Sequence, residues 1–406
     1  MDKWKRKRKF LSAFAGVLSF CLLFFGIAVN LSGCSSQVGK EPLSISGFAF
    51  NTTYTLTLNQ GGNQELLDNC VSKCNEYEEI FSRTRKDSEL YQLNALEDLY
   101  LKVWQEKTGK SDIAGEWSKL SRKELTAGKI SEYEKCLQKK VKENKLPEQT
   151  FSVSSRGALL VTVSKELAEL IQKGLDYSEL SQGGFDITID PVSSLWDFTS
   201  EEATVPEKEV IKQRLPYVDY RKLTLNENVV EFAQPGMGID LGGIAKGYIA
   251  DCLKEYLVGE GVTSGMINLG GNVLCIGQKS EKEPFHIGIQ QPFADRNETI
   301  TAIYADDVSV VSSGIYERYI QMDGKLYHHI LNPKTGYSYE NNLIGVTIVS
   351  EKSADGDGLS TTGFVLGLED GLKLINSLDG VEAVFITKDE TLHYSDGFEK
   401  MLYQEK

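Results

Sequence analysis

The sequence contains little cysteine and lacks the motifs that would identify a common cofactor-binding fold directly. Its seven cysteines include no CxxC pair. Cys70 and Cys74 lie four residues apart, a spacing that fits half-buried packing on one helix face as well as a disulfide. A disulfide-stapled fold is therefore not indicated. The GxGxxG fingerprint and the Walker P-loop are both absent from the sequence.

Basic residues are also fewer than acidic ones. Lys and Arg total 44 against 58 Asp and Glu, which gives a formal net charge of −14. Such an acidic chain is a poor candidate for nucleic-acid binding, because the phosphate backbone requires a basic surface. The hydrophobic fraction of 41% and the charged fraction of 25% are those of an ordinary globular protein with a substantial core.

The first residues have the pattern of a secretory signal. A basic cluster, "KWKRKRKF", precedes the uncharged run "LSAFAGVLSFCLLFFGIAVN" and then "LSGCSS". Residues 31–34 resemble the lipobox of bacterial lipoproteins, in which the cysteine is lipidated. We therefore expect a signal peptide over residues 1–33, lipidation at Cys34, a tether over residues 34–45, and anchoring of the exported protein to the outer face of the cell membrane. The alternative is an uncleaved transmembrane anchor, since the apolar run is nearly long enough to span a bilayer.

The remainder, residues 46–406, mixes strand and helix patterns. Alternation in "ISGFAFNTTYTLTL" predicts a strand, and helical spacing follows to about residue 94. Residues 97–155 are rich in Lys and Glu and hold no strand-like run, so we interpret them as a charged helical insertion without a core of its own. Strands with glycine turns and two terminal helices follow. This mixture predicts an α+β fold with a single catalytic domain.

The segment "SADGDGLSTTGF" (353–364) combines carboxylates, hydroxyls and glycines. It is not an EF-hand loop, because counting from Asp355 leaves Ser360 at the glycine position and Leu366 at the glutamate position. Asp357 and Thr361 are four residues apart, at the entry of a helix predicted to begin near residue 359. A carboxylate and a hydroxyl on one side of the first turn suit a hard divalent ion such as Mg²⁺. The alternative is an ordinary helix cap without an ion.

A second candidate is "GIDLGGIAKGYIAD" (238–251). The pattern predicts a strand ending at Asp240, a glycine turn, and a helix starting near Ile244. Glycines let the backbone approach a phosphate, and Lys246 supplies a positive charge. The alternative is a tight strand-to-helix turn that needs glycine for conformational reasons alone.

Two further segments hold chemistry-bearing side chains. "LYHHILNPKTGYS" contains two of the four histidines, and His329, before a turn, suits a general base as well as a structural histidine. "SQGGFDIT" (181–188) offers an aromatic ring and a carboxylate after a glycine pair, which suits ring stacking and a hydrogen bond or a plain strand start.

The order of these motifs resembles the FAD:protein FMN transferase (ApbE) family. The series "GFAFNTTYTL", "FSRTRKDSELYQLN", "GGFDITIDPVSSLWDF", "IDLGGIAKGYIAD", "INLGGNV", "IGIQQP", "VSSGIYERY", "HHILNPKTGYS" and "DGLSTTGFVLG" follows the family order, from about residue 46 to the end, apart from residues 97–155. The resemblance implies that the protein binds FAD and, with Mg²⁺, moves its FMN half onto a Ser or Thr hydroxyl of an acceptor protein while AMP leaves. Many members are lipoproteins.

The resemblance also assigns roles to individual residues. It implies His329 as the base, and Asp357, Thr361 and the carbonyl of Gly243 as metal ligands. The implied FAD-binding positions are Phe50, Thr84, Gly184, Phe185, Asp186, Asp240, Lys246 and Ile330. Phe50 and Thr84 depart from the family pattern, which has Met and usually an aromatic residue there. Asp355 is one carboxylate more than the simplest family pattern contains.

Two other functions fit the same motifs. One is an FAD pyrophosphatase that yields FMN and AMP, with water in place of the acceptor hydroxyl. The other is a flavin-binding lipoprotein without catalysis, although storage requires neither a metal site nor a base. The implied partner is an acceptor flavoprotein with a Ser/Thr-Gly-Ala-Thr-like motif. The sequence contains no such motif, so the protein is not expected to be its own target.

Overall fold

The computed structural model describes residues 41–200 and 202–404. The predicted signal peptide and the lipidation site at Cys34 lie outside these described residues, as does most of the predicted tether. The first strand begins at Leu43, inside the range predicted as tether. Among the described residues, none of the helices combines the length and the hydropathy that a membrane span requires.

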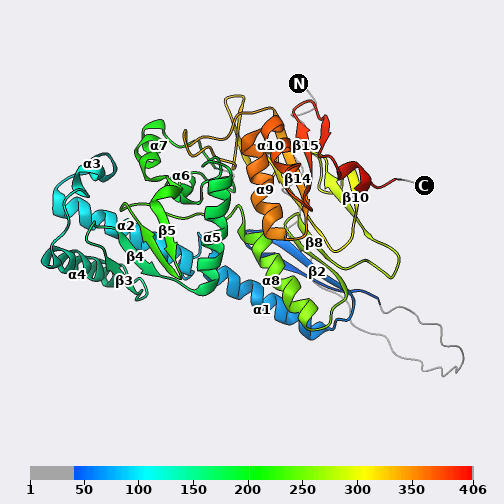
Figure 1. Ribbon diagram of the computed structural model, residues 1–406, viewed down its shortest axis with the longest axis horizontal. Helices are drawn as coiled ribbons and strands as arrows, with labels where there is room; N and C mark the ends of the chain where they lie inside the picture. Colours follow the sequence, from blue (N-terminus) through cyan, green and yellow to red (C-terminus); the bar gives the residue numbers. More distant parts are fainter. Residues whose placement is uncertain (1–40, 201, 405–406) are drawn as a thin grey trace, which may run out of the picture. The chain divides into compact units, whose positions relative to one another are not determined.

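An eight-stranded sheet organises the fold (Figure 1). All neighbouring strands in it are antiparallel. Their order in the sheet is β1 (Leu43–Ala49), β2 (Thr52–Gln60), β7 (Ser264–Leu269), β8 (Asn272–Ile276), β11 (Ser309–Gly314), β14 (Leu343–Ser350), β15 (Glu382–Thr387) and β16 (Leu392–Tyr394). Every residue of β14 is buried, as expected for a strand covered on both faces, whereas the edge strand β1 alternates between exposed and less exposed positions.

Helices α8 (Ala245–Gly259), α9 (Ser353–Leu366) and α10 (Leu368–Ile375) cover one face of this sheet (Figure 1). Helix α9 packs on β11 and β14, while α8 packs on β7 and β8 and along α9. Helix α1 (Gln64–Phe81) follows the β1–β2 hairpin and packs against α8. Two segments that resembled phosphate-binding and metal-binding motifs, 238–251 and 353–364, therefore lie side by side.

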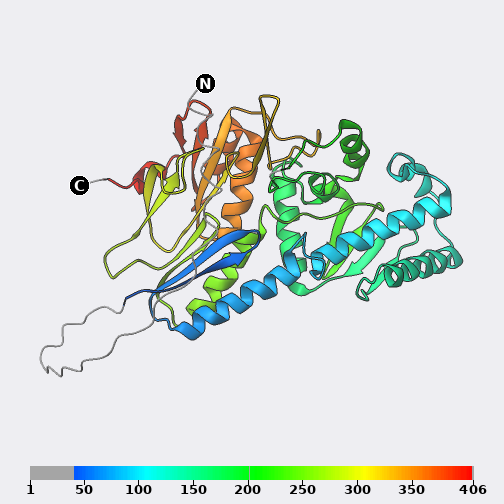
Figure 2. The same ribbon diagram turned by 180° about the vertical axis from the view of Figure 1, so that it is seen from behind.

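A second, four-stranded antiparallel sheet lies beside α2 (Glu89–Thr108), on the other side of the α1–α2 connection from the eight-stranded sheet (Figure 2). Its strand order is β3 (Phe151–Val153), β4 (Leu159–Thr162), β6 (Val229–Phe232) and β5 (Leu223–Asn226). The helices around it are α2 (Glu89–Thr108), α3 (Ile113–Leu120), α4 (Ala127–Glu143), α5 (Lys165–Leu180), α6 (Asp190–Ser193) and α7 (Lys208–Arg214). Two separate hairpins are formed by β9 (Phe285–Gln290) with β10 (Thr299–Ala305), and by β12 (Tyr319–Met322) with β13 (Lys325–His328). The mixture of helices and antiparallel strands confirms the predicted α+β class.

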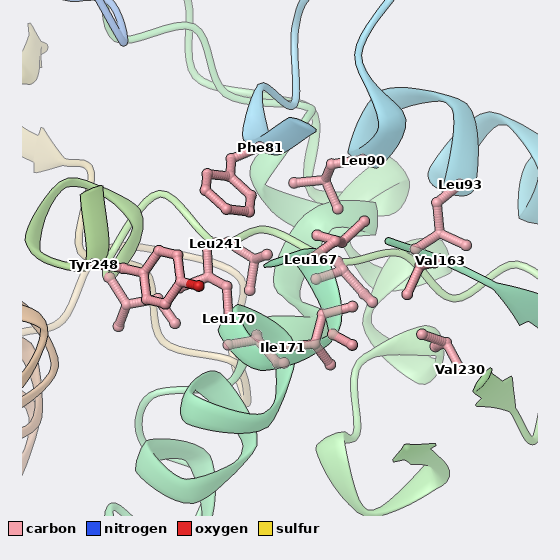
Figure 3. Packing of buried hydrophobic residues seen from close by; sticks show 14 of the residues in the cluster. Phe81, Leu90, Leu93, Val163, Leu167, Leu170, Ile171, Val230, Leu241 and Tyr248 are labelled. Carbon is pink, nitrogen blue, oxygen red and sulfur yellow. The ribbon is translucent and has the colours of Figure 1, made fainter. Parts of the chain in front are cut away.

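One apolar cluster joins both sheets and fixes the position of the glycine turn. Figure 3 shows side chains of α5 packed with Leu90 and Leu93 of α2, Val230 of β6, and Leu241. Leu241 and Ile244 are completely buried. Because these two side chains anchor the turn from inside, the residues between and beside them are held in place at the surface of the core.

The structure corrects the description of residues 97–155. Helix α2 begins at Glu89, so the predicted boundary at 97 falls inside a helix, and β3 at Phe151–Val153 contradicts the expectation that the range holds no strand. The range also contributes to the main core, where the Trp104 ring contacts those of Trp117 and Tyr133. These aromatic residues are spread over three helices and separated by many lysines. The sequence therefore showed no sign that they are buried together. Cys70 and Cys74 are both buried, and neither is in a disulfide.

Candidate active site

The candidate site is centred on a close contact between α8 and α9. A Cβ on Gly247 would lie 2.2 Å from the Ser353 carbonyl oxygen, so only glycine allows the two helices to approach this closely. At this contact the Gly247 N–H donates to Asp357 Oδ2 at 2.6 Å. The glycine thus aligns the carboxylate of one motif with the backbone of the other.

Asp357 is almost fully buried, with 4% of its surface exposed, and is surrounded by donors. Asn272 Nδ2 donates to Asp357 Oδ1 at 3.2 Å, and Lys246 Nζ lies 3.7 Å from the same oxygen. Thr361 lies one turn further along α9, with its hydroxyl 3.4 Å from Ser313 Oγ. The predicted pair of Asp357 and Thr361 therefore shares one helix face, and the predicted cation Lys246 lies beside it.

The predicted start of this helix was wrong. Helix α9 begins at Ser353 instead of near residue 359, so Asp357 and Thr361 lie inside the helix and do not flank its free N–H groups. The reason is a distant cap: the Asp251 carboxylate accepts the N–H groups of Ser353 at 2.8 Å and Ala354 at 2.9 Å. A cap supplied from α8 leaves no signal in the local sequence around residue 353.

The donor set fits Mg²⁺ in chemical kind. Asp357 offers a carboxylate, Thr361 a hydroxyl and Gly243 a backbone carbonyl, all of them the hard oxygens that Mg²⁺ prefers. Within the described part of the chain, no group of three or more His, Cys, Asp or Glu side chains is placed to hold a metal ion. A metal at this site would therefore depend on the hydroxyl and the carbonyl as well as on one carboxylate, and on substrate oxygens or water for the rest.

Asp355 has a structural partner of its own. The Tyr177 hydroxyl donates to Asp355 Oδ1 at 2.7 Å. Burial, followed by the charge of Asp355, raises the pKa of Tyr177. The additional carboxylate of the motif therefore joins α9 to α5 and is not directed at Asp357.

The glycine turn places Asp240 at the centre of a polar network. Asp240 Oδ2 accepts from Ser193 Oγ at 2.7 Å and lies 3.3 Å from Arg83 Nε, while Oδ1 accepts from the Gly242 N–H at 3.0 Å. Burial disfavours the charged carboxylate, but the Arg83 guanidinium and the two hydrogen bonds outweigh it and lower the pKa of Asp240. The predicted strand ending at Asp240 is absent. The chain before the glycine turn is irregular, and the Asp240 N–H donates to the Ile187 carbonyl instead of to a neighbouring strand.

Arg83 also binds a second carboxylate. Its Nη1 donates to Asp190 Oδ1 at 3.3 Å, so one guanidinium bridges α6 and the glycine turn. Burial raises the pKa of Asp190 to about 7, although Arg83 opposes this shift. The neighbouring Thr84, a predicted FAD-binding residue, is exposed, and its hydroxyl lies 3.5 Å from Ser82 Oγ.

The segment around residue 185 packs on the glycine turn. A Cβ on Gly243 would lie 2.8 Å from Phe185 Cε2, so the aromatic ring covers this glycine closely. The Gly184 carbonyl accepts from the Tyr339 hydroxyl at 3.0 Å. Phe185, Gly184 and Gly243, three residues singled out from the sequence, are thus brought together.

The segment 181–188 ends in a 3₁₀ turn, η2 (Ile187–Ile189), which Asp186 caps, and does not begin the strand that was one of its two interpretations. Asp186 Oδ1 accepts from the Thr188 N–H at 2.8 Å and from its hydroxyl at 2.6 Å, and Oδ2 accepts from the Tyr220 N–H at 3.0 Å. Burial raises the pKa of Asp186, and these bonds counteract the shift. Both of its oxygens are thus engaged within the chain, as are those of Asp240.

His329 follows directly on strand β13. Its N–H donates to the Arg318 carbonyl at 3.2 Å, and its Nδ1 lies 3.3 Å from the same oxygen. This geometry assigns the ring proton to Nδ1 and leaves the lone pair on Nε2. Burial and then the neighbouring positive groups, among them Arg318, lower the pKa of His329 to about 3. Ile330 is buried beside it, and its carbonyl accepts from the Tyr339 N–H.

Phe50 forms the tight turn between β1 and β2, where one strand had been expected. Phe50 and Asn51 have φ values of 55° and 56°, the left-handed region that suits a two-residue hairpin but is costly for a bulky side chain. Two contacts hold this turn: the Phe50 N–H donates to Glu78 Oε1 at 3.1 Å, and Arg318 Nη2 donates to the Asn51 carbonyl at 3.1 Å.

Several residues of the site were not predicted from the sequence. The motifs that contain Asn272 and Arg318 were recognised, but no role was attached to either residue. Arg83 and Ser193 also passed unnoticed, because their partners are distant in the chain: Arg83 reaches Asp190, 107 positions later, and Ser193 reaches Asp240, 47 positions later.

Comparisons with known proteins point to one family. A sequence model of the ApbE family matches residues 123–385. An FAD:protein FMN transferase of Klebsiella pneumoniae is 36% identical over 275 residues, covering 67% of this chain and 85% of that protein. One of Treponema pallidum is 33% identical over 256 residues, covering 59% of this chain and 71% of that protein. The crystal structure of the ApbE protein of Thermotoga maritima has a TM-score of 0.68 at 25% identity, covering 90% of this chain and 100% of that one.

Proposed function

The chain belongs to the ApbE family, and on this premise we propose that it is a Mg²⁺-dependent FAD:protein FMN transferase. In the proposed reaction the FMN half of FAD moves to a Ser or Thr hydroxyl of an acceptor protein through a phosphoester bond, and AMP leaves. The observation that carries the proposal is the α8–α9 contact, where the N–H of Gly247 and the side chain of Lys246 both face the buried carboxylate of Asp357. A flavin carrier would need no such arrangement.

Cleavage of a pyrophosphate requires positioning and neutralisation of charge more than covalent help from the protein. Asp357, Thr361 and the Gly243 carbonyl would hold Mg²⁺, which when bound supplies charge neutralisation at the phosphates. Lys246, in the first turn of α8, adds a positive charge beside them. Phe185, packed over Gly243, offers a ring face to the flavin at the same turn.

His329 would act on the acceptor hydroxyl. Its Nδ1 proton points to the Arg318 carbonyl, so Nε2 is the atom that can take the hydroxyl proton. The acceptor oxygen then bonds to the FMN phosphorus, the bridging P–O bond breaks, and AMP leaves with the bonding electron pair. The low pKa of His329 keeps the ring neutral at physiological pH, which a base requires. The negative charge of bound FAD would raise this pKa and strengthen the base.

The location and the partner are proposed from the sequence. A lipid on Cys34 would anchor the exported enzyme to the outer face of the cell membrane, next to membrane-bound or exported flavoproteins that carry a Ser/Thr-Gly-Ala-Thr-like motif. Incorporation of a radiolabelled lipid precursor that is lost in a Cys34→Ala variant would test the anchor. Labelling that persisted in that variant would contradict it.

A labelling assay tests the transfer. The full-length chain is mixed with FAD, Mg²⁺ and an acceptor domain that carries the motif, and flavin fluorescence is read on the denatured acceptor band. We expect covalent fluorescence that disappears with EDTA and in an Asp357→Ala variant. Release of FMN and AMP with no labelling would indicate a pyrophosphatase, and FAD bound without any change would indicate a carrier.

A further inference from the structure

Arg318 connects two parts of the candidate site that are far apart in the sequence. It precedes β12, and its backbone carbonyl accepts the N–H of His329 at 3.2 Å. Its guanidinium reaches the β1–β2 turn, where Nη2 donates to the Asn51 carbonyl at 3.1 Å. The side chain therefore crosses from the predicted base to the strained turn that carries Phe50.

Arg318 differs from the neighbouring cations because it has no carboxylate within ion-pair distance among the described residues. Arg83 pairs with Asp190 and Asp240, and Lys246 lies 3.7 Å from Asp357. Arg318, by contrast, forms no ion pair with any residue in the described ranges 41–200 and 202–404. The neighbouring Glu317 does not supply a full negative charge, because burial raises the pKa of its carboxyl to about 7 although Lys246 and Arg318 oppose this shift. An additional anion would therefore complete the surroundings of the half-buried guanidinium.

The position of this cation agrees with an anion site. Its charge helps the Arg83 guanidinium to lower the pKa of Asp240 against the effect of burial, and it adds to burial in lowering the pKa of His329. Arg318 is therefore electrostatically close both to the glycine turn and to the base. The guanidinium has five N–H donors in a planar fork, and the Asn51 carbonyl is its one recorded acceptor among the described residues.

We propose that Arg318 binds the pyrophosphate of FAD. The inference rests on the proposed function, since it assumes that FAD occupies the site. A guanidinium fork can contact two phosphate oxygens at once, which a lysine ammonium cannot match in geometry. Arg318 would thus contribute to holding the phosphates within reach of His329, while its backbone carbonyl orients the imidazole.

A purely structural role makes a different prediction. If Arg318 served only to hold the Asn51 carbonyl, its loss would loosen the turn at Phe50 and weaken every flavin equally. A pyrophosphate-binding role affects FAD and leaves riboflavin, which has no phosphate, unaffected. The ratio of the two affinities therefore separates the two roles.

The experiment measures binding of FAD and of riboflavin to the full-length chain by flavin fluorescence, with Mg²⁺ present, for wild type, Arg318→Ala, Arg318→Lys and Arg122→Ala. Arg122 is an exposed arginine between α3 and α4, so its variant removes the same charge far from the site. Thermal unfolding of each variant checks that the fold is intact.

We expect Arg318→Ala to bind FAD about 10- to 100-fold more weakly, with riboflavin affinity within about twofold of wild type. Arg318→Lys should recover part of the loss, Arg122→Ala should behave as wild type, and FAD binding by Arg318→Ala should depend less on salt. Equal weakening of both flavins, or unchanged FAD affinity, would overturn the proposal. Binding does not require transfer, so a chain that bound FAD without labelling an acceptor would contradict the proposed function and leave this comparison valid.

Discussion

The backbone N–H of Gly247 donates to the carboxylate of Asp357 at 2.6 Å, across 110 positions of the chain. This bond joins the glycine-turn motif of α8 to the acidic motif of α9. It exists because the absence of a side chain at Gly247 lets α8 approach the Ser353 carbonyl. The orientation of the central carboxylate thus depends on a helix–helix distance.

A methyl group at this contact should disturb the site. Gly247→Ala would place a Cβ 2.2 Å from the Ser353 oxygen, so the helices must separate and the bond to Asp357 lengthens. We expect a loss of about 1–3 kcal/mol in the free energy of unfolding and a fall of at least about tenfold in the transfer rate. Denaturant unfolding and the labelling assay measure the two effects.

Gly259→Ala is the matched control. Gly259 belongs to the same helix, is exposed, and a Cβ there would have no neighbour within 4 Å. Alanine is the better helix former, so this variant should be as stable as wild type or up to about 1 kcal/mol more stable. If Gly247→Ala unfolded and reacted as Gly259→Ala does, the close contact would not be required.

Substitutions of the two aspartates in the α9 motif should affect the protein differently, one the transfer rate and the other the stability. Asp357→Asn removes the buried charge beside Lys246, so we expect loss of Mg²⁺-dependent transfer. Asp355→Asn alters only the contact with the Tyr177 hydroxyl, so we expect a loss of about 1 kcal/mol in stability and little change in rate. Rates measured over a Mg²⁺ titration compare the variants. A raised Mg²⁺ requirement in Asp355→Asn would place Asp355 in the metal site.

This distinction illustrates how far the sequence could lead. Helical spacing correctly placed Asp357 and Thr361 on one face of a helix, and the order of motifs indicated the family. The sequence did not reveal that Asp251 caps α9 from another helix, which shifts its start to Ser353. It likewise allowed a strand start where the Asp186 carboxylate caps a 3₁₀ turn. In both cases a long-range or side-chain hydrogen bond overrode the local pattern.

The roles of the paired charges could be assigned only once the fold was known. Nothing local to Arg83 predicts that it bridges Asp190 and Asp240. Nor does the sequence around Arg318 predict that its side chain forms no ion pair with any residue that the structure describes. Hydrophobic periodicity positions the core residues Leu241 and Ile244 well, because burial of apolar surface dominates that choice. Pairing of charges depends on which loops the topology brings together, and a single sequence does not encode that in a readable pattern.

The pH dependence of the transfer should reflect the low pKa of His329. In the free enzyme this pKa is about 3, so the imidazole stays neutral above about pH 5. We expect kcat/KM for FAD to show no acid limb from His329 between pH 5 and 8. In kcat, which reports the FAD complex, the limb should appear at higher pH, because the phosphates raise the pKa. A His329-dependent limb in kcat/KM near pH 6.5 would contradict this assignment.

Asp190 should make stability depend on pH. Its folded pKa of about 7 lies above the value of the unfolded chain, so its stabilising contribution is complete at low pH and is lost as pH rises through 7. Asp190→Asn removes this titration. The free energy of unfolding of the variant, relative to wild type, should therefore rise by on the order of 2 kcal/mol between pH 5 and 8.

Urea unfolding at several pH values measures this difference. The control is Asp379→Asn, which changes an exposed carboxyl group after α10 and should follow wild type at every pH. A constant difference between Asp190→Asn and wild type across the range would show that Asp190 is ionised throughout and that Arg83 outweighs its burial.

The most direct test of the account is the intact mass of an acceptor domain after incubation with the full-length chain, FAD and Mg²⁺. We expect the mass to increase by one FMN less one water, with one AMP released per acceptor, and no increase when the target Ser or Thr is replaced by Ala. An unchanged acceptor mass together with stoichiometric FMN and AMP in solution would contradict the transferase and identify the reaction as hydrolysis of FAD.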